Sequence, residues 1–194
     1  MNIIKNVAKY KAMMQTAHDL FWKHGFKRVT IEEVCRKANI SKMTFYKYYP
    51  NKLELAKAVF DAVVEGAMDK FKNLMTEDLT VNERMHGLLT LKMEGTADVS
   101  HEFIQDFYRN PDLGLSTYIE QKTNEYWQNI IEDFRSGQNK GWFREDFKPE
   151  IILFAGQKLI ELANDEKVQQ LYANPQELIM ELANLIAYGI SPRN

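Results

Sequence analysis

Apolar side chains recur at spacings of three and four residues along nearly the whole chain, and this helical period restricts the fold more than any other feature. Between Val7 and His24 one such stripe contains Tyr10, Met13, Met14, Ala17, Leu20 and Phe21. Asn-Gly hairpin turns and runs of alternating apolar and polar residues, the usual signals of strands, do not occur in the sequence. The sequence therefore predicts an all-α protein of about nine helices.

Signals at helix ends predict three helices within the first fifty residues. Gly25 stands where a left-handed residue ends the first helix, and Thr30 is a suitable N-cap for the second. Asn39 tolerates the left-handed conformation of a tight turn, and Ser41 can cap a third helix over Lys42–Tyr49. Two short helices joined by such a turn form a helix-turn-helix, whose second helix enters the major groove of DNA.

The charge distribution supports a polyanion as the partner of this segment. Residues 1–50 contain ten Lys or Arg and three Asp or Glu, a net charge of +7, whereas the whole chain has a net charge of −2. A basic segment joined to an acidic remainder is typical of a nucleic-acid-binding module attached to a second domain.

The residue types of the third helix divide by face. Phe45 and Tyr49, four residues apart, are expected to point inward. Lys42 can reach guanine O6 and N7, and the methyl group of Thr44 can touch thymine. Phosphate contacts, which set the register without reading sequence, are assigned to Thr30, Tyr46, Tyr48 and Lys52. The full set of expected DNA-contacting residues is Thr30, Ser41, Lys42, Met43, Thr44, Tyr46, Lys47, Tyr48 and Lys52.

The segment Met13–Leu55 resembles, without a gap, the DNA-binding domain of the TetR family of bacterial transcriptional regulators. The resemblance is carried by Ala17, Leu20, Phe21, Gly25, Phe26, Thr30, Ile31, Val34, Ala38, Ser41, Phe45, Tyr46, Tyr49, Asn51, Lys52 and Leu55. The chain departs from the usual pattern at Asn39 and Met43, where Gly is usual or frequent, and has Tyr48 where His or Tyr occurs. A bulky Met43 either limits the approach of the backbone to DNA or makes an apolar base contact.

The resemblance implies a DNA-binding domain over residues 1–52 and a helical ligand-binding and dimerisation domain over residues 53–194. It also implies a homodimer formed through the last two long helices, 149–164 and 175–189. Such a dimer is expected to bind a palindromic double-stranded DNA operator as a repressor and to be released by a small-molecule effector. The alternative is a ligand-independent helix-turn-helix protein with a structural or partition role on DNA.

Several aromatic and apolar residues of the second domain are candidates for a ligand cavity, since such cavities are mostly apolar. The candidates are Met93, Phe103, Phe107, Tyr126, Trp127 and Ile130. An aromatic side chain at helical spacing is more often an ordinary part of the core, so both interpretations stay open for each residue.

Other functions lack their sequence signals. No nucleophile–base constellation, phosphate-binding Gly loop or metal-ligand spacing is found, so we expect no enzyme activity, no cofactor and no metal. Cys35 is the only cysteine, which excludes an internal disulfide. Neither a signal peptide nor a membrane-spanning apolar run is recognisable, and we expect a cytoplasmic protein.

Overall fold

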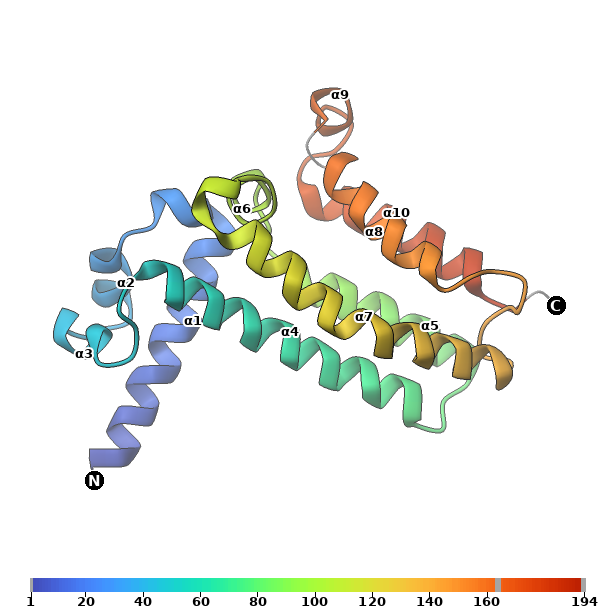
Figure 1. Cartoon of the computed structure of the whole chain (residues 1–194), viewed down its shortest axis with the longest axis horizontal. Coiled ribbons are helices and arrows are strands. Elements are labelled where there is room, and N and C mark those ends of the chain that lie inside the picture. Colours follow the sequence, from blue (N-terminus) through green and yellow to red (C-terminus); the bar gives the residue numbers. More distant parts are fainter. Residues whose placement is uncertain (1, 163–164, 193–194) are drawn as a thin grey trace. The chain divides into compact units, whose positions relative to one another are not determined.

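The computed structural model describes residues 2–162 and 165–192, and within them the chain is helical without strands (Figure 1). The elements are α1 (Asn2–Arg28), α2 (Ile31–Lys37), α3 (Lys42–Tyr46), α4 (Lys52–Thr76), α5 (Val81–Gly95), α6 (His101–Ile104), the π-helix η1 (Gln105–Arg109), the 3-10 helix η2 (Pro111–Leu113), α7 (Leu115–Asn139), α8 (Glu150–Leu162), α9 (Glu166–Gln169) and α10 (Pro175–Ile190). The predicted all-α class is confirmed. The described residues form ten α-helices, and the short α9 was not among the helices expected from the sequence.

Thr30 and Asn39 have the backbone conformations expected at the helix ends of the first segment, whereas Gly25 combines a positive φ with an extended ψ in place of the expected left-handed helical conformation. Gly25 has φ 74° and ψ 171°, which breaks the helical path of α1 three residues before its end. The Thr30 hydroxyl accepts a hydrogen bond from the Glu33 N–H at 3.1 Å, as an N-cap does. Asn39 adopts φ 53° in the turn between α2 and α3. Helix α3 ends at Tyr46 instead of Tyr49, because the N–H groups of the next two tyrosines both bond to the Phe45 carbonyl.

The chain forms two compact units. The N-terminal unit contains the residues up to Val64 together with Asp98–Tyr118, and the C-terminal unit contains Glu65–Ala97 together with the residues from Ile119 onward. The division predicted at residues 52 and 53 concerns function and stays a prediction. The structure groups the segment Asp98–Tyr118 with α1, α2 and α3, which the sequence did not indicate.

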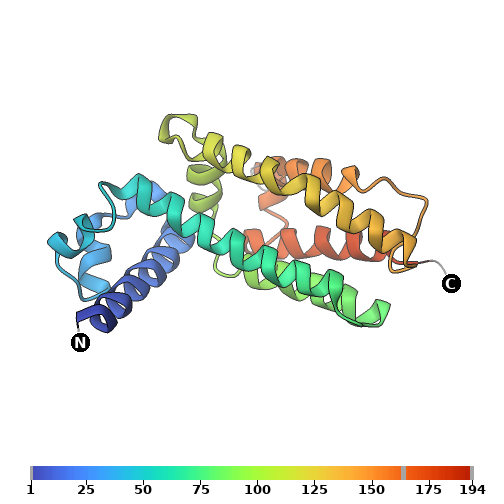
Figure 2. The same cartoon turned by 60° about the horizontal axis from the view of Figure 1, so that its bottom comes forward.

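The first helix of that segment, α6, lies against α1 in the N-terminal unit (Figure 2). An aromatic cluster joins the two. The ring centroids of Trp22 and Phe103 lie 4.4 Å apart, and those of Phe103 and Phe107 lie 4.4 Å apart. The backbone N–H and the hydroxyl of Ser100 both donate to the Trp22 carbonyl, at 3.0 and 2.9 Å. The start of α6 is therefore fixed to α1 by both packing and hydrogen bonds.

The C-terminal unit has its own core, to which four helices contribute. Its buried members are Phe71, Met75, Met85, Phe134, Phe143, Ala187 and Ile190. Arg84 is fully buried at the side of this core, where its guanidinium lies 3.5 Å from the ring centroid of Trp142 and donates to the carbonyls of Glu77 and Leu79. The N-cap predicted for the last helix is present, since the Asn174 side chain accepts from the Glu177 N–H at 3.1 Å.

Candidate nucleic-acid interface

Helices α2 and α3 form the predicted helix-turn-helix on the α1 scaffold. Phe45 is fully buried and anchors the inner face of α3, as expected from the sequence. Val34 and Cys35 are the buried residues of α2, and burial raises the pKa of the Cys35 thiol. Phe45 is the buried residue of the five-residue helix α3, so its side chain supplies the inward packing of that helix.

The outer face of α3 carries residues that the sequence predicts to contact DNA. Met43 is 73% exposed and Tyr46 is 54% exposed, and both are large side chains that a monomeric unit leaves in water. Lys42 and Lys47 are also exposed, whereas Thr44 is half-buried. The Thr44 hydroxyl is hydrogen-bonded to the Ser41 hydroxyl at 3.0 Å, and the Ser41 hydroxyl accepts from the Thr44 N–H at 3.1 Å.

Lys42 is paired across the turn with Glu32 of α2. The hydrogen bond from Lys42 lowers the pKa of the Glu32 carboxyl, and the same contact raises the pKa of the Lys42 ammonium. Both groups are exposed to solvent, so the pair contributes little to stability. The base contact predicted for Lys42 would compete with this ion pair.

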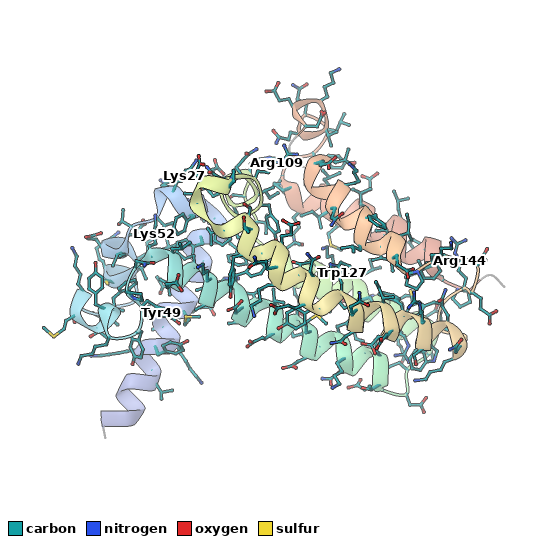
Figure 3. All side chains as sticks on the ribbon, in the orientation of Figure 1. Lys27, Tyr49, Lys52, Arg109, Trp127 and Arg144 are labelled. Atoms are coloured by element: carbon teal, nitrogen blue, oxygen red, sulfur yellow. The ribbon has the colours of Figure 1, made fainter. Side chains whose placement is uncertain are left out.

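The tyrosines after α3 connect it to α1. The phenol groups of Tyr10 and Tyr49 (the latter labelled in Figure 3) are hydrogen-bonded at 3.0 Å. The Tyr48 and Tyr10 ring centroids lie 5.2 Å apart. Burial is the main cause that raises the pKa of Tyr49, and the hydrogen bond with Tyr10 raises it further. Tyr48, a predicted phosphate contact, is therefore half-buried against α1.

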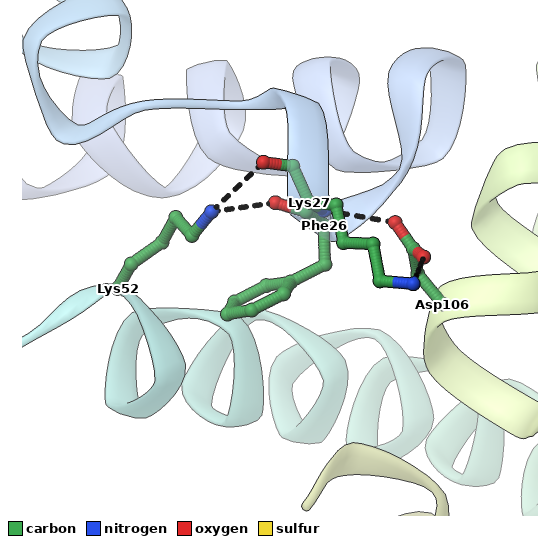
Figure 4. Close-up of polar contacts among 4 residues, drawn as sticks. All are labelled: Phe26, Lys27, Lys52 and Asp106. Carbon is green, nitrogen blue, oxygen red and sulfur yellow. Dashed lines mark hydrogen bonds and ion pairs between the residues drawn. The ribbon is translucent and has the colours of Figure 1, made fainter. Parts of the chain in front are cut away.

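Lys52, another predicted phosphate contact, has a structural role that the sequence did not reveal (Figure 4). Its ammonium donates to the carbonyls of Phe26 and Val29, both at 2.7 Å, and lies 3.4 Å from the Lys27 carbonyl. It also lies 4.2 Å from the ring centroid of Phe26. Burial lowers the pKa of Lys52, while the charge of Asp106 acts in the opposite direction. A phosphate contact would require Lys52 to give up one of these bonds, and it stays a prediction.

We expect Lys52→Met to destabilise the N-terminal unit by about 2 kcal/mol, since hydrogen bonds from a charged donor contribute about 1.5–3 kcal/mol. Urea unfolding measures this change. The control is Lys47→Met, which removes an exposed lysine of the same unit and is expected to stay within about 0.5 kcal/mol of the wild type. Equal stabilities of the two variants would contradict the structural role of Lys52.

Asp106 is the residue near this site that the sequence analysis missed. It is 6% exposed, its carboxylate accepts from the Lys27 N–H at 2.8 Å, and it lies 3.8 Å from the Lys27 ammonium (Figure 4). Sequence reasoning had no signal for this contact, because the two residues are 79 positions apart and belong to different helices. Asp106 thus fixes η1 to the end of α1, next to the backbone that Lys52 holds.

The six predicted ligand residues fall into two groups. Phe103 and Phe107 belong to the N-terminal unit, where they pack against Trp22 and are 3% and 0% exposed. The other four lie in the C-terminal unit and are half-buried or exposed: Met93, Tyr126, Trp127 and Ile130. Their contact with a ligand stays a prediction.

A groove of about 620 Å³ lies between the first half of α5 and the end of α10. Its lining residues are Thr80, Val81, Asn82, Met85, His86, Leu89, Ala187, Tyr188, Ser191 and Pro192. None of the predicted ligand residues is among them. Within the described part of the chain, no group of three or more His, Cys, Asp or Glu side chains is placed to hold a metal ion. No helix formed by the described residues is long and apolar enough to cross a bilayer.

Comparison with known proteins gives consistent matches for the N-terminal segment and for the fold. Residues 14–59 match the model of the family described as bacterial regulatory proteins, tetR family. The chain is 26% identical to the uncharacterized HTH-type transcriptional regulator YhgD of Bacillus subtilis (strain 168), over 79% of this chain and 81% of that protein.

Two solved structures share the fold. The fatty acid degradation regulator FadR from Bacillus halodurans superposes with a TM-score of 0.68 at 19% identity, over 95% of this chain and 97% of that one. A protein from Saccharomonospora viridis, solved in complex with choline, superposes with a TM-score of 0.64 at 19% identity, over 94% of this chain and 97% of that one.

Proposed function

We propose that this chain, which belongs to the TetR family of bacterial transcriptional regulators, is a cytoplasmic repressor that binds a palindromic operator as a homodimer and is released by a small-molecule effector. The observation that carries the DNA-binding part is the exposed outer face of α3 on a buried Phe45 anchor. Side chains that water surrounds in the free unit are available to base edges in the major groove.

The exposed apolar residues of the C-terminal unit support dimerisation through α8 and α10. Ile151 and Phe154 of α8 are 56% and 57% exposed, and Leu185 and Tyr188 of α10 are 63% and 79% exposed. In each pair the residues are three positions apart, so each pair lies on one face of its helix. Clustered exposed apolar side chains of this size indicate an interface. Of the predicted interface ranges 149–164 and 175–189, residues 163 and 164 lie outside the described part of the chain.

Release by an effector requires a difference in ligand affinity between the DNA-bound and free forms of the dimer. Two reading helices about one DNA turn apart, roughly 34–36 Å, fit a palindrome, and a ligand that favours another spacing weakens binding. A coupling free energy of about 1–3 kcal/mol changes operator affinity roughly 5- to 150-fold. A ligand-independent DNA-binding protein would instead show the same operator affinity with every compound that raises its melting temperature.

Operator recognition tests the proposed role of α3. With an operator selected from a pool of randomised palindromes, Lys42→Met is expected to weaken binding by roughly 5- to 150-fold and to relax the preference at one base position, as the loss of a base contact does. Fluorescence anisotropy with the selected operator and its single-base variants measures both effects.

The control is Glu32→Gln, which removes the partner of Lys42 but keeps the cation. We expect tighter binding from this variant, because Lys42 no longer has to leave an ion pair. If Lys42→Met bound every base variant with an unchanged preference, Lys42 would contact only the backbone of DNA.

A further inference from the structure

We propose that Met43 reads the C5-methyl group of a thymine in the major groove, so that each half of the operator presents an A·T pair to the middle of α3. This inference names the chemical group that the reading helix recognises, and it rests on the proposed function. Three features of the structure support it: the position of Met43 on α3, the bonds already made by its polar neighbours, and the charge around it.

Met43 lies at the outermost position of α3. Phe45 is the buried residue of this helix and defines its inner face. Successive residues of an α-helix are rotated by about 100°, so Met43, two residues before Phe45, points about 160° away from it. The 73% exposure of Met43 agrees with that position. When α3 lies in the major groove, Met43 is therefore the side chain of this helix that is directed most squarely at the base edges.

The polar side chains on either side of Met43 already have partners within the N-terminal unit. Lys42 is paired with Glu32 of α2. Thr44 is half-buried, and its hydroxyl is bonded to the Ser41 hydroxyl at 3.0 Å. Lys42 and the Thr44 hydroxyl can bond with a base edge only by exchanging these contacts. Met43 makes no hydrogen bond with the residues that the structure describes, so its contact with DNA breaks none.

The base edges of the major groove offer a suitable partner for an apolar side chain in the methyl group of thymine. Guanine, cytosine and adenine present hydrogen-bond donors and acceptors there, and thymine adds its C5-methyl group. Contact between Met43 and that methyl group removes apolar area of both from water, which is favourable. Contact with a polar base edge would instead remove water from donors and acceptors without replacing their hydrogen bonds. A methionine at this position therefore favours thymine.

Tyr46 extends the apolar surface at Met43. It is largely exposed and lies three residues after Met43, which makes the two side chains neighbours on the surface of α3. Its ring packs edge-to-face on the Phe45 ring, with the centroids 5.2 Å apart. Phe45 thus supports the Tyr46 ring from the inside, while the unbranched and flexible Met43 side chain can adapt to the surface that it meets.

The charge around this apolar pair favours DNA over an apolar protein surface as the partner. Lys42 and Lys47 are exposed on the same short segment, and residues 1–50 have a net charge of +7. An apolar protein partner would have to cover these cations, which is costly. Duplex DNA has phosphates on both sides of the major groove, so it can neutralise the lysines while the bases between them meet Met43.

Replacement of thymine by deoxyuridine in the operator tests this inference, because uracil pairs with adenine through the same groups and lacks only the methyl group. The probe is the operator selected from randomised palindromes, with each thymine replaced in turn in both half-sites, and fluorescence anisotropy measures the affinity. At the thymine that faces Met43, the wild type is expected to bind the uracil operator about fourfold more weakly for each half-site, and roughly 15-fold more weakly in total, because a buried methyl group contributes about as much as a buried CH₂ group.

Met43→Ala identifies the thymine concerned. At that position the variant is expected to bind the thymine and the uracil operator equally, and to bind the thymine operator as weakly as the wild type binds the uracil operator. Met43→Leu keeps a large apolar side chain and is expected to retain most of the preference for thymine. Thr44→Ser removes the methyl group of Thr44 but keeps the hydroxyl that bonds with Ser41, and it is also expected to retain the preference.

Val7→Ala is the matched control, because Val7 is an exposed apolar residue of α1 in the same unit and lies outside the helix-turn-helix. This variant is expected to bind both operators as the wild type does. Thermal unfolding followed by circular dichroism checks that Met43→Ala keeps the wild-type melting temperature, as expected for a change at an exposed side chain.

The inference would be overturned by equal wild-type affinity for thymine and uracil at every position, by a preference that Met43→Ala leaves unchanged, or by selected half-sites that share no A·T pair. Loss of the preference in Thr44→Ser and not in Met43→Ala would assign the methyl contact to Thr44. Failure of the proposed function is a different result. A protein that selects no operator contradicts both, whereas one that selects an operator and does not distinguish thymine from uracil retains the proposed function and loses only this inference.

Discussion

Gly25→Ala is expected to destabilise the N-terminal unit by about 3 kcal/mol or more. Gly25 has φ 74° and ψ 171°, a region of backbone conformation that is essentially restricted to glycine. An added Cβ would also lie 2.7 Å from Oδ2 of Asp106 and 2.9 Å from the Glu102 carbonyl oxygen. Because the second of these atoms is backbone, the clash can be relieved only by moving α6 and η1 away from α1. Urea unfolding and operator binding both measure the consequence.

Two other glycines separate the effect of conformation from that of contact. Gly114 has φ 69° but nothing within 4 Å of an added Cβ, so Gly114→Ala is expected to cost only about 1–2 kcal/mol. Gly66 lies inside α4 with the same free space, and Gly66→Ala is expected to stabilise by roughly 0.5–1 kcal/mol. If Gly25→Ala cost no more than Gly114→Ala, the contact of Asp106 with the end of α1 would not be tight.

Phe154→Asp is expected to convert the dimer to a monomer and to weaken operator binding by more than about 100-fold. A charge placed on the exposed apolar face of α8 would be desolvated in a dimer, which destabilises the dimer. Two separate chains then bind the two operator half-sites independently and lose the affinity gained by linking two binding modules, which is typically 10²–10⁴-fold. Sedimentation velocity measures the oligomeric state, and anisotropy measures binding to the full palindrome and to one half-site.

Leu171→Asp is the matched control, since Leu171 is 75% exposed but lies in the turn after α9. It is expected to leave both the dimer and the operator affinity unchanged. Leu185→Asp on α10 is expected to act like Phe154→Asp. A dimer that survived both Phe154→Asp and Leu185→Asp would place the interface elsewhere.

The helix-turn-helix was predictable because its determinants are local. The turn residue Asn39 and the caps Thr30 and Ser41 act within three residues of themselves, and the structure contains each of them as predicted. The inner position of Phe45 follows from helical spacing and is confirmed by its burial. The length of α3 was predicted three residues too long, because no local rule reports the early turn that carries Tyr48 and Tyr49 toward Tyr10 of α1.

In the second half of the chain, the packing partners of the aromatic side chains could not be predicted from the sequence. Phe103 and Phe107 have the residue type of a cavity lining, and the structure packs them against α1. Residue type gives the tendency to be buried, but it does not say which neighbour will cover the side chain.

The sequence by itself determined the all-α class, the position of the reading helix and the basic character of the first fifty residues, because periodicity, capping and charge are properties of short segments. Only the tertiary structure decided that Lys52 holds the carbonyls at the end of α1, that Asp106 binds the Lys27 N–H from 79 residues away, and that the buried indole N–H of Trp127 has no acceptor among the described residues. The physical reason is that hydrogen-bond satisfaction depends on which atoms meet in space. Contacts between residues far apart in the sequence are set by the packing of whole helices, and the spacing of residues along the chain does not reveal them.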